Sequence, residues 1–138
     1  MLSNASKYAI RAVLYLAVND DKEKNIGIKQ ISKELKIPSP YLSKILQSLA
    51  KHKLLSSTKG PHGGFALRML PEEISLMDIV KIIDGPDFFN TCLIGLKSCT
   101  EIEKDDVCQI HNKYAPIKNQ LEKLFKEQTI ESIIKGNT

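Results

Sequence analysis

Three cysteines and a histidine lie close together in one segment of the sequence. Cys92, Cys99 and Cys108 follow the spacing C-x6-C-x8-C, and His111 completes a C-x-x-H pair with the last of them. Thiolates select iron–sulfur clusters, zinc or copper(I). Three Cys and one His suit structural zinc, and imidazole also replaces thiolate in some [2Fe–2S] centres. The spacing therefore predicts a metal site but leaves zinc and an iron–sulfur cluster open, beside the alternative of three free cysteines and a surface histidine.

A second group of residues has the side-chain types that contact DNA. Short polar side chains near the start of a helix reach base edges in the major groove, lysines neutralise phosphates, and glycines permit a close approach of the backbone. The group comprises Ser39, Tyr41, Ser43, Lys44, Gln47, Ser48 and Lys51, followed by Lys59, Gly60, His62, Gly63 and Gly64. The alternative is an ordinary pair of helices and a β-hairpin with a solvated polar face.

Three helices are expected in the first part of the chain to position these residues. Apolar residues recur at helical spacing in residues 4–18, 28–35 and 40–52. The third segment has a stripe that we expect to face the core, consisting of Leu42, Ile45, Leu46 and Leu49. This stripe directs the polar residues of the same helix toward solvent.

A tight break and a hairpin complete this part of the chain. Pro38 disfavours helical geometry at the residue before it, while Ser39 is the expected N-cap and Pro40 the expected first helical residue of the next helix. Two short apolar segments, residues 54–58 and 65–70, flank a glycine-rich tip and predict strand–turn–strand. This order of elements is that of a winged helix–turn–helix.

The rest of the chain predicts two more helices around an irregular segment. Ser75 and Asp78 resemble a helix start, and Gly85 resembles a stop. Residues 86–112, which hold all the cysteines, have no clear period. A long amphipathic helix follows, and its stripe of Ile117, Leu121, Leu124 and Phe125 has few partners in so small a domain, which predicts a homodimer contact. We expect a short apolar tail to cap this helix, with Ile130, Ile133 and Ile134.

The expected fold class is therefore mainly α with a small β-hairpin, in one compact unit. Residues 1–85 form a winged helix–turn–helix DNA-binding domain, residues 86–112 a cysteine-rich loop, and residues 113–138 a C-terminal dimerisation helix.

Composition narrows the function classes. The 138 residues are 42% apolar and 26% charged, which is typical of one ordered domain. Residues 1–70 carry twelve Lys and Arg against four Asp and Glu (net +8), and residues 71–138 carry eight against twelve (net −4). A basic half favours a polyanionic partner.

The sequence also bears on the location and the enzymatic activity of the protein. No run of uncharged apolar residues approaches the length that a membrane helix needs. Arg11 interrupts the apolar run near the N-terminus. These features predict a cytoplasmic location, where disulfides are disfavoured. The sequence shows neither a Cys–His pair beside a strand-to-helix elbow nor a phosphate-binding glycine loop, so we do not expect an enzyme.

Four motifs resemble those of the IscR/NsrR/CymR family of bacterial winged-helix transcription regulators. They are Ser6-Lys7-Tyr8-Ala9-Ile10-Arg11-Ala12, Ile37-Pro38-Ser39-Pro40-Tyr41-Leu42, Lys59-Gly60-Pro61-His62-Gly63-Gly64-Phe65, and the three cysteines with Cys-x-x-His. The resemblance covers nearly the whole chain and implies a homodimer, joined by the long C-terminal helix, that binds palindromic double-stranded promoter DNA. In cluster-bearing members the three cysteines hold an iron–sulfur cluster that senses redox state, nitric oxide or iron–sulfur status.

The chain also departs from the family pattern. The x8 spacing is long, Tyr114 stands where relatives often have Trp, and Ser43 stands where some have a carboxylate that affects the choice of DNA site. Relatives take the fourth ligand either from the His or from an acidic residue on the partner's first helix. Residues 5–18 contain no Asp or Glu, which favours His111 and, with it, [2Fe–2S] over [4Fe–4S]. The alternative is a regulator of the same fold with structural zinc or no metal, responding to a small-molecule ligand.

Overall fold

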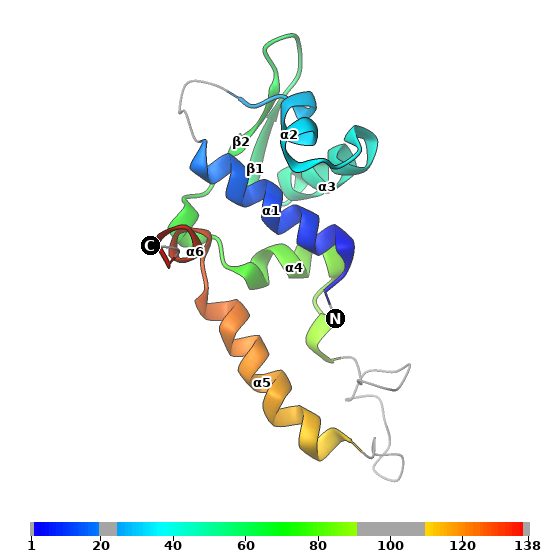
Figure 1. Ribbon diagram of the computed structural model, residues 1–138, viewed down its shortest axis with the longest axis vertical. Helices are drawn as coiled ribbons and strands as arrows, with labels where there is room; N and C mark the ends of the chain where they lie inside the picture. The colour runs from blue at the N-terminus through cyan, green and yellow to red at the C-terminus, as the bar shows by residue number, and fades with distance from the viewer. Residues whose placement is uncertain (1, 20–24, 91–109, 137–138) are drawn as a thin grey trace.

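The computed structural model describes residues 2–19, 25–90 and 110–136 (Figure 1). These residues are mainly helical, with one two-stranded antiparallel sheet, as the sequence predicts. In chain order the elements are α1 (Asn4–Val18), α2 (Ile28–Leu35), α3 (Ser39–Lys51), β1 (Leu55–Thr58), β2 (Gly64–Leu67), η1 (Pro71–Glu73), α4 (Leu76–Asp84), η2 (Phe88–Asn90), α5 (His111–Glu127) and α6 (Ile130–Gly136). No helix of the described ranges is both long enough and apolar enough to cross a membrane.

The main core lies between α1, α3 and the hairpin. The predicted stripe of α3 is confirmed, because all four of its residues are buried. On α1 the residues facing this core include Ala9 and Ala12, whose small side chains let the helices approach closely. Each fully buried leucine contributes about 1.5–3 kcal/mol to this packing. The core thereby fixes which face of α3 remains exposed.

The turn between α2 and α3 forms as predicted, but the capping residue differs. Lys36 adopts a left-handed conformation (φ 57°, ψ 45°), and the next residue, Ile37, is buried. The N-cap of α3 is Pro38 rather than Ser39, with no side-chain cap. The helix begins one residue early because the Pro38 carbonyl already accepts a hydrogen bond from the amide of Leu42, at 3.0 Å.

The hairpin is joined by a third backbone segment. In β1 and β2, Leu55 pairs with Leu67 and Thr58 with Gly64. Ile26, just before α2, forms an isolated antiparallel bridge to Phe65, with two backbone hydrogen bonds of 2.9 and 2.8 Å. The second strand ends at Leu67, before the predicted residue 70. The amides of Arg68 and Met69 both donate to the carbonyl of Leu54, so the regular strand pairing stops there.

A second core joins α4, η2 and α5. Helix α4 begins with the predicted capping box of Ser75 and Asp78 and stops at Gly85 (φ 93°). The ring of Phe89 contacts the ring of Phe125 on α5 with a centroid distance of 5.4 Å. Met77 and Val80 of α4 complete the buried part of this cluster. The long helix is therefore attached to the body of the chain near its C-terminal end.

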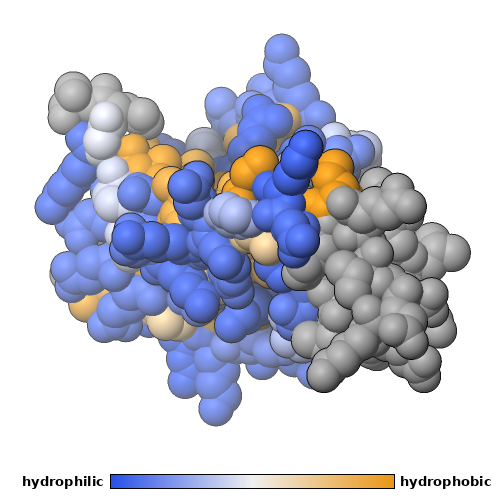
Figure 2. Space-filling view, turned by 90° about the horizontal axis from the view of Figure 1, so that it is seen from below, coloured by the Kyte–Doolittle hydropathy of each residue, from blue (hydrophilic) through white to orange (hydrophobic). Residues whose placement is uncertain are grey.

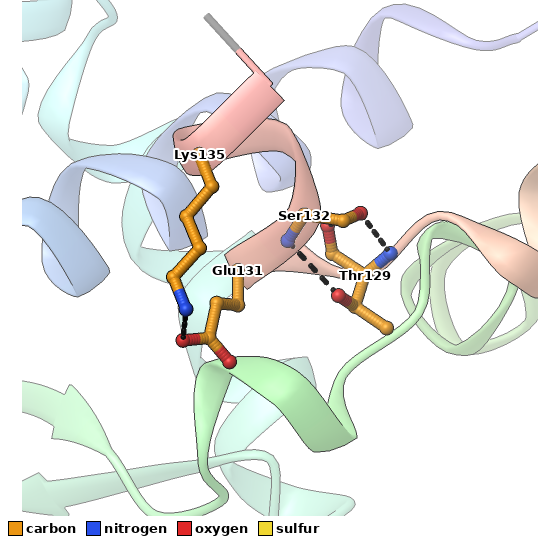
Figure 3. Close-up of polar contacts among 4 residues, drawn as sticks. All are labelled: Thr129, Glu131, Ser132 and Lys135. Carbon is orange, nitrogen blue, oxygen red and sulfur yellow. Dashed lines mark hydrogen bonds and ion pairs between the residues drawn. The ribbon is translucent and has the colours of Figure 1, made fainter. Parts of the chain in front are cut away.

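The C-terminal apolar tail does not cap α5, contrary to the sequence prediction. It forms α6, which turns back and packs on α1 and η1 (Figure 1). Thr129 and Ser132 start this helix with reciprocal hydrogen bonds, each side-chain oxygen accepting from the other residue's amide at 3.1 and 2.8 Å (Figure 3). Ile130 is then fully buried in the main core, so burial of this side chain explains the reversal of direction.

An exposed ion pair spans one turn of α6. The Lys135 ammonium lies 2.8 Å from a carboxylate oxygen of Glu131 (Figure 3). The hydrogen bond and the positive charge of Lys135 lower the pKa of Glu131, and the same contact raises the pKa of Lys135. The stabilisation from Glu131 is therefore present above its unfolded-state pKa and is lost as the pH falls. Because solvent screens this pair, its contribution to stability is small.

Candidate nucleic-acid interface and metal centre

The predicted DNA-contacting residues of α3 share one side of the helix. Tyr41, Lys44, Gln47 and Lys51 are exposed, while the serines among them are half-buried. The buried stripe on the opposite side fixes this orientation. Figure 1 shows α3 and the hairpin at the same end of the molecule. The structure therefore brings the two predicted parts of the interface together on the basic half of the chain.

Hydrogen bonds within α3 distinguish these polar side chains. The Gln47 amide donates to the Ser43 hydroxyl at 3.2 Å. The Ser48 hydroxyl donates to the backbone carbonyl of Lys44 at 3.1 Å, so it is bound to its own helix. Ser39 lies half-buried in the first turn. Lys44 and Gln47 are consequently the exposed residues at the middle of this face, with Ser43 orienting the second of them.

We define the wing as residues 59–64, which are the turn between the strands and Gly64, the first residue of β2. Its glycines serve two purposes. Lys59, Gly60 and His62 are exposed, and Gly60 needs glycine for its conformation (φ 106°). A Cβ on Gly63 would lie 2.1 Å from the Thr58 carbonyl oxygen, and one on Gly64 would lie 2.3 Å from the Ile26 carbonyl oxygen. The sequence interpretation assigns all three glycines to the approach of DNA. In addition, Gly63 is required by the backbone of Thr58 and Lys59, and Gly64 by the backbone of Ile26, just before α2.

We therefore expect Gly63→Ala to destabilise the protein by about 1–3 kcal/mol, because backbone atoms must move to admit the Cβ. Urea unfolding followed by circular dichroism measures this change. Gly136→Ala is the matched control, since a Cβ at Gly136 meets nothing within 4 Å, and its effect should stay within about 0.5 kcal/mol. Equal unfolding free energies for Gly63→Ala and the wild type would contradict the packing described for the wing.

The four predicted dimer residues of α5 separate into two groups. Phe125 is only 7% exposed and packs in the second core, with Leu121 against the same cluster. Ile117 and Leu124 are 62% and 48% exposed. Figure 2 shows that hydrophobic residues form separate patches on an otherwise hydrophilic surface. Two residues of the predicted stripe thus have partners inside this chain, and the two exposed ones remain available for contact with another molecule.

The predicted metal ligands lie at the border of the described residues. Cys92, Cys99 and Cys108 fall outside them, and His111 is the first residue of α5. Within the described ranges, no three or more His, Cys, Asp or Glu side chains gather in a way that could hold a metal ion. The helix begins two residues before the predicted boundary at 113, so the histidine belongs to α5 rather than to the loop.

Sequence reasoning missed two contacts of α1, one of which involves the interface residue Tyr41. The rings of Tyr8 on α1 and Tyr41 on α3 meet edge to face, with centroids 5.7 Å apart. The Ser6 hydroxyl donates to a carboxylate oxygen of Asp84 at 2.6 Å. Each pair joins residues far apart in the sequence, and periodicity within one helix carries no signal for such pairings.

Comparison with known proteins connects this geometry to a family. The sequence profile of the Rrf2 family, described as an iron-dependent transcriptional regulator, matches residues 2–136. A protein of Aquifex aeolicus (strain VF5), named as an HTH-type transcriptional regulator, is 34% identical over 134 residues. That match covers 97% of this chain and 91% of the Aquifex protein.

Solved structures share the fold over nearly the whole chain. CymR (YrzC), the global cysteine regulator of B. subtilis, superposes with a TM-score of 0.78 at 20% identity, covering 96% of this chain and 95% of that one. IscR of T. potens superposes with a TM-score of 0.73 at 20% identity, covering 100% and 88%. The winged-helix fold and the family resemblance are confirmed. The chain belongs to the Rrf2 family and is a DNA-binding transcription regulator, not an enzyme.

Proposed function

We propose that this regulator is a homodimer that reads palindromic promoter DNA and whose affinity is controlled by an iron–sulfur cluster. Residues 1–85 form the DNA-binding part, residues 86–112 hold the cluster, and residues 113–138 join the two copies. The observation that carries the DNA-binding part of this proposal is the exposed polar face of α3 next to the wing, on the half of the chain with net charge +8. The proposed location is the cytoplasm, where thiols stay reduced.

The reading of DNA is assigned to α3 and the wing. The half-buried and exposed residues Ser39, Tyr41, Ser43, Lys44, Gln47, Ser48 and Lys51 face away from the core. An α-helix fits the major groove, where each base pair presents a distinct pattern of donors and acceptors. We assign phosphate contacts to Lys59 and His62, which are exposed at the wing tip. Two copies of α3 are needed to read the two halves of a palindrome.

We expect Lys44→Ala and Gln47→Ala each to weaken specific DNA binding while the fold is retained. Loss of a base contact should cost about 1–3 kcal/mol and relax specificity, whereas loss of a phosphate contact should reduce the salt slope by about one. Fluorescence anisotropy titrations of a promoter duplex at several salt concentrations separate the two cases. Lys81→Ala, an exposed lysine on α4, is the matched control and should bind as the wild type does. Unchanged affinity in both α3 variants would reject this placement.

The dimer contact is assigned to the exposed part of the α5 stripe. Residues seven apart on a helix lie almost on the same side, and those eight apart are rotated by about 80°. Ile117 and Leu124 therefore share one side, while Phe125 is turned toward α4, where it is buried. The side with Ile117 and Leu124 is directed to the second copy.

The cluster is assigned to Cys92, Cys99, Cys108 and His111. Three thiolates and an imidazole fit an iron–sulfur cluster chemically, and the family profile is described as iron-dependent. Helix α1 contains no Asp or Glu, which favours the histidine as fourth ligand and [2Fe–2S] over [4Fe–4S]. A bound cluster would supply a redox-active and nitric-oxide-reactive group. The protein's part would be to hold it with residues that lie, in the sequence, between the DNA-binding part and the body of α5.

A further inference from the structure

The N-terminal turns of α1 are held on two sides by other helices. Ser6 is fully buried, and its hydroxyl donates to Oδ2 of Asp84, the last residue of α4, at 2.6 Å. Tyr8, two residues later, contacts the ring of Tyr41 on α3. Residues two apart on a helix are rotated by about 200°, so the two contacts lie on nearly opposite sides of α1. Helix α1 contacts both α3 and α4, which also contact each other, and Figure 1 shows the three helices packed together.

The position of Asp84 is unfavourable for its own helix. A carboxylate at a helix C-terminus faces the negative end of the helix dipole. The hydroxyl of Ser6 supplies a hydrogen bond to this carboxylate, of the charge-assisted kind that is stronger than a neutral one. The contact therefore ties the C-terminal end of α4 to the first turns of α1. In the sequence, this end lies eight residues before Cys92.

The contact on the other side of α1 reaches the proposed interface. Tyr41 lies in the first turn of α3 and is 40% exposed. Its ring meets that of Tyr8 at 88° with centroids 5.7 Å apart, which is a favourable edge-to-face arrangement. Tyr8 is half-buried against the main core, so it is the more firmly held of the two rings. Tyr8 therefore limits the orientations that Tyr41 can adopt.

We infer that these two contacts form one link, through α1, by which the end of α4 sets the position of Tyr41 for DNA binding. Ser6 and Tyr8 are positioning residues that need not touch DNA themselves. This inference rests on the proposed function, because it requires that Tyr41 lies in the interface. It adds a specific route by which a change at the end of α4 would alter DNA affinity.

The first test is a double-mutant cycle on DNA affinity. Tyr8→Phe keeps the ring and should bind promoter DNA within 2-fold of the wild type. Tyr8→Leu removes the ring and should weaken binding about 2- to 10-fold. In a Tyr41→Leu background the same change should cost less than about 2-fold, because the partner ring is gone. An equal loss in both backgrounds would show that Tyr8 does not act through Tyr41 and would overturn the inference.

The second test follows Tyr41 itself across α1. The chain has four tyrosines and no tryptophan, so fluorotyrosine labelling gives four fluorine signals, and Tyr41→Phe identifies the one from Tyr41. Asp84→Leu and Ser6→Ala should shift this signal, whereas Asp84→Asn, which keeps an acceptor oxygen, should leave it in place. A merely structural role of the Ser6–Asp84 pair would lower thermal stability without moving the signal. An unmoved Tyr41 signal in both Asp84→Leu and Ser6→Ala would overturn the link.

The outcomes separate this inference from the proposed function. If Tyr41→Leu leaves DNA affinity unchanged while Lys44→Ala lowers it, the link has no role in DNA binding and the inference is wrong, although α3 still reads DNA. If Lys44→Ala and Gln47→Ala leave the affinity unchanged as well, the assignment of the interface to α3 also fails.

Discussion

Replacement of any one of Cys92, Cys99 or Cys108 by alanine is expected to abolish the visible absorbance of the anaerobically purified protein. Each cysteine supplies one thiolate of the proposed cluster, and thiolates are the soft donors that iron–sulfur clusters prefer. The same variants should change affinity for promoter DNA about 5- to 150-fold, the usual range for coupling between two sites. Absorption spectra and anisotropy titrations, both under anaerobic conditions, measure the two effects.

The neighbouring serine provides a matched control for these variants. Ser98→Ala changes the residue next to Cys99 without removing a thiolate, and it should keep both the chromophore and the DNA affinity. His111→Ala should retain a labile or spectrally altered cluster, because water or an added thiol can take one ligand position. A cysteine variant that keeps the full chromophore would remove that cysteine from the ligand set.

The second large effect is expected from Ile117→Glu on α5. The variant places a charge on the side chain that is 62% exposed in one copy and that we assign to the dimer contact. Burial of an unpaired carboxylate there is costly, so the protein should become monomeric at micromolar concentration. Affinity for a full palindrome should fall by about two orders of magnitude or more, because one copy reads only one half-site. Light scattering and anisotropy titrations report the two changes.

A charge on the other side of the same helix is the control. Asn119 is exposed and is rotated by about 200° from Ile117, so Asn119→Glu should remain dimeric. Leu121 is less suitable for this test, since it packs against the chain's own second core and its replacement would also loosen α5. A dimeric Ile117→Glu variant with wild-type DNA affinity, or a monomeric wild type, would reject the assignment of the contact to this side of α5.

The helices of the DNA-binding part could be predicted from the sequence because their buried residues recur at one period. The stripe of Leu42, Ile45, Leu46 and Leu49 indicates both the helix and its exposed face, and all four residues are buried. Helix α3 starts one residue before the predicted position, because the Pro38 carbonyl accepts the first helical hydrogen bond. Periodicity places the middle of a helix better than its ends.

Features that depend on distant partners could not be predicted in this way. Gly63 and Gly64 are fixed by carbonyls of Thr58 and Ile26, and nothing in the local sequence distinguishes this from space reserved for DNA. The stripe of α5 predicts one continuous apolar surface, but the ring of Phe125 packs against Phe89 of the same chain. Ile130 is likewise buried in the main core, and this packing turns the C-terminal tail away from α5. In each case tertiary packing decided between placements that the local pattern allowed.

The proposal that this protein holds an iron–sulfur cluster is tested most directly by the elements bound to it. Protein purified anaerobically from iron-replete cells should contain iron and acid-labile sulfide in equal amounts, about two of each per chain for [2Fe–2S]. Inductively coupled plasma mass spectrometry and sulfide assay measure both, and the same sample gives zinc. Stoichiometric zinc without iron or sulfide would contradict the cluster and point to structural zinc. Protein free of iron, sulfide and zinc would contradict both the cluster and structural zinc, and would favour a small-molecule signal instead.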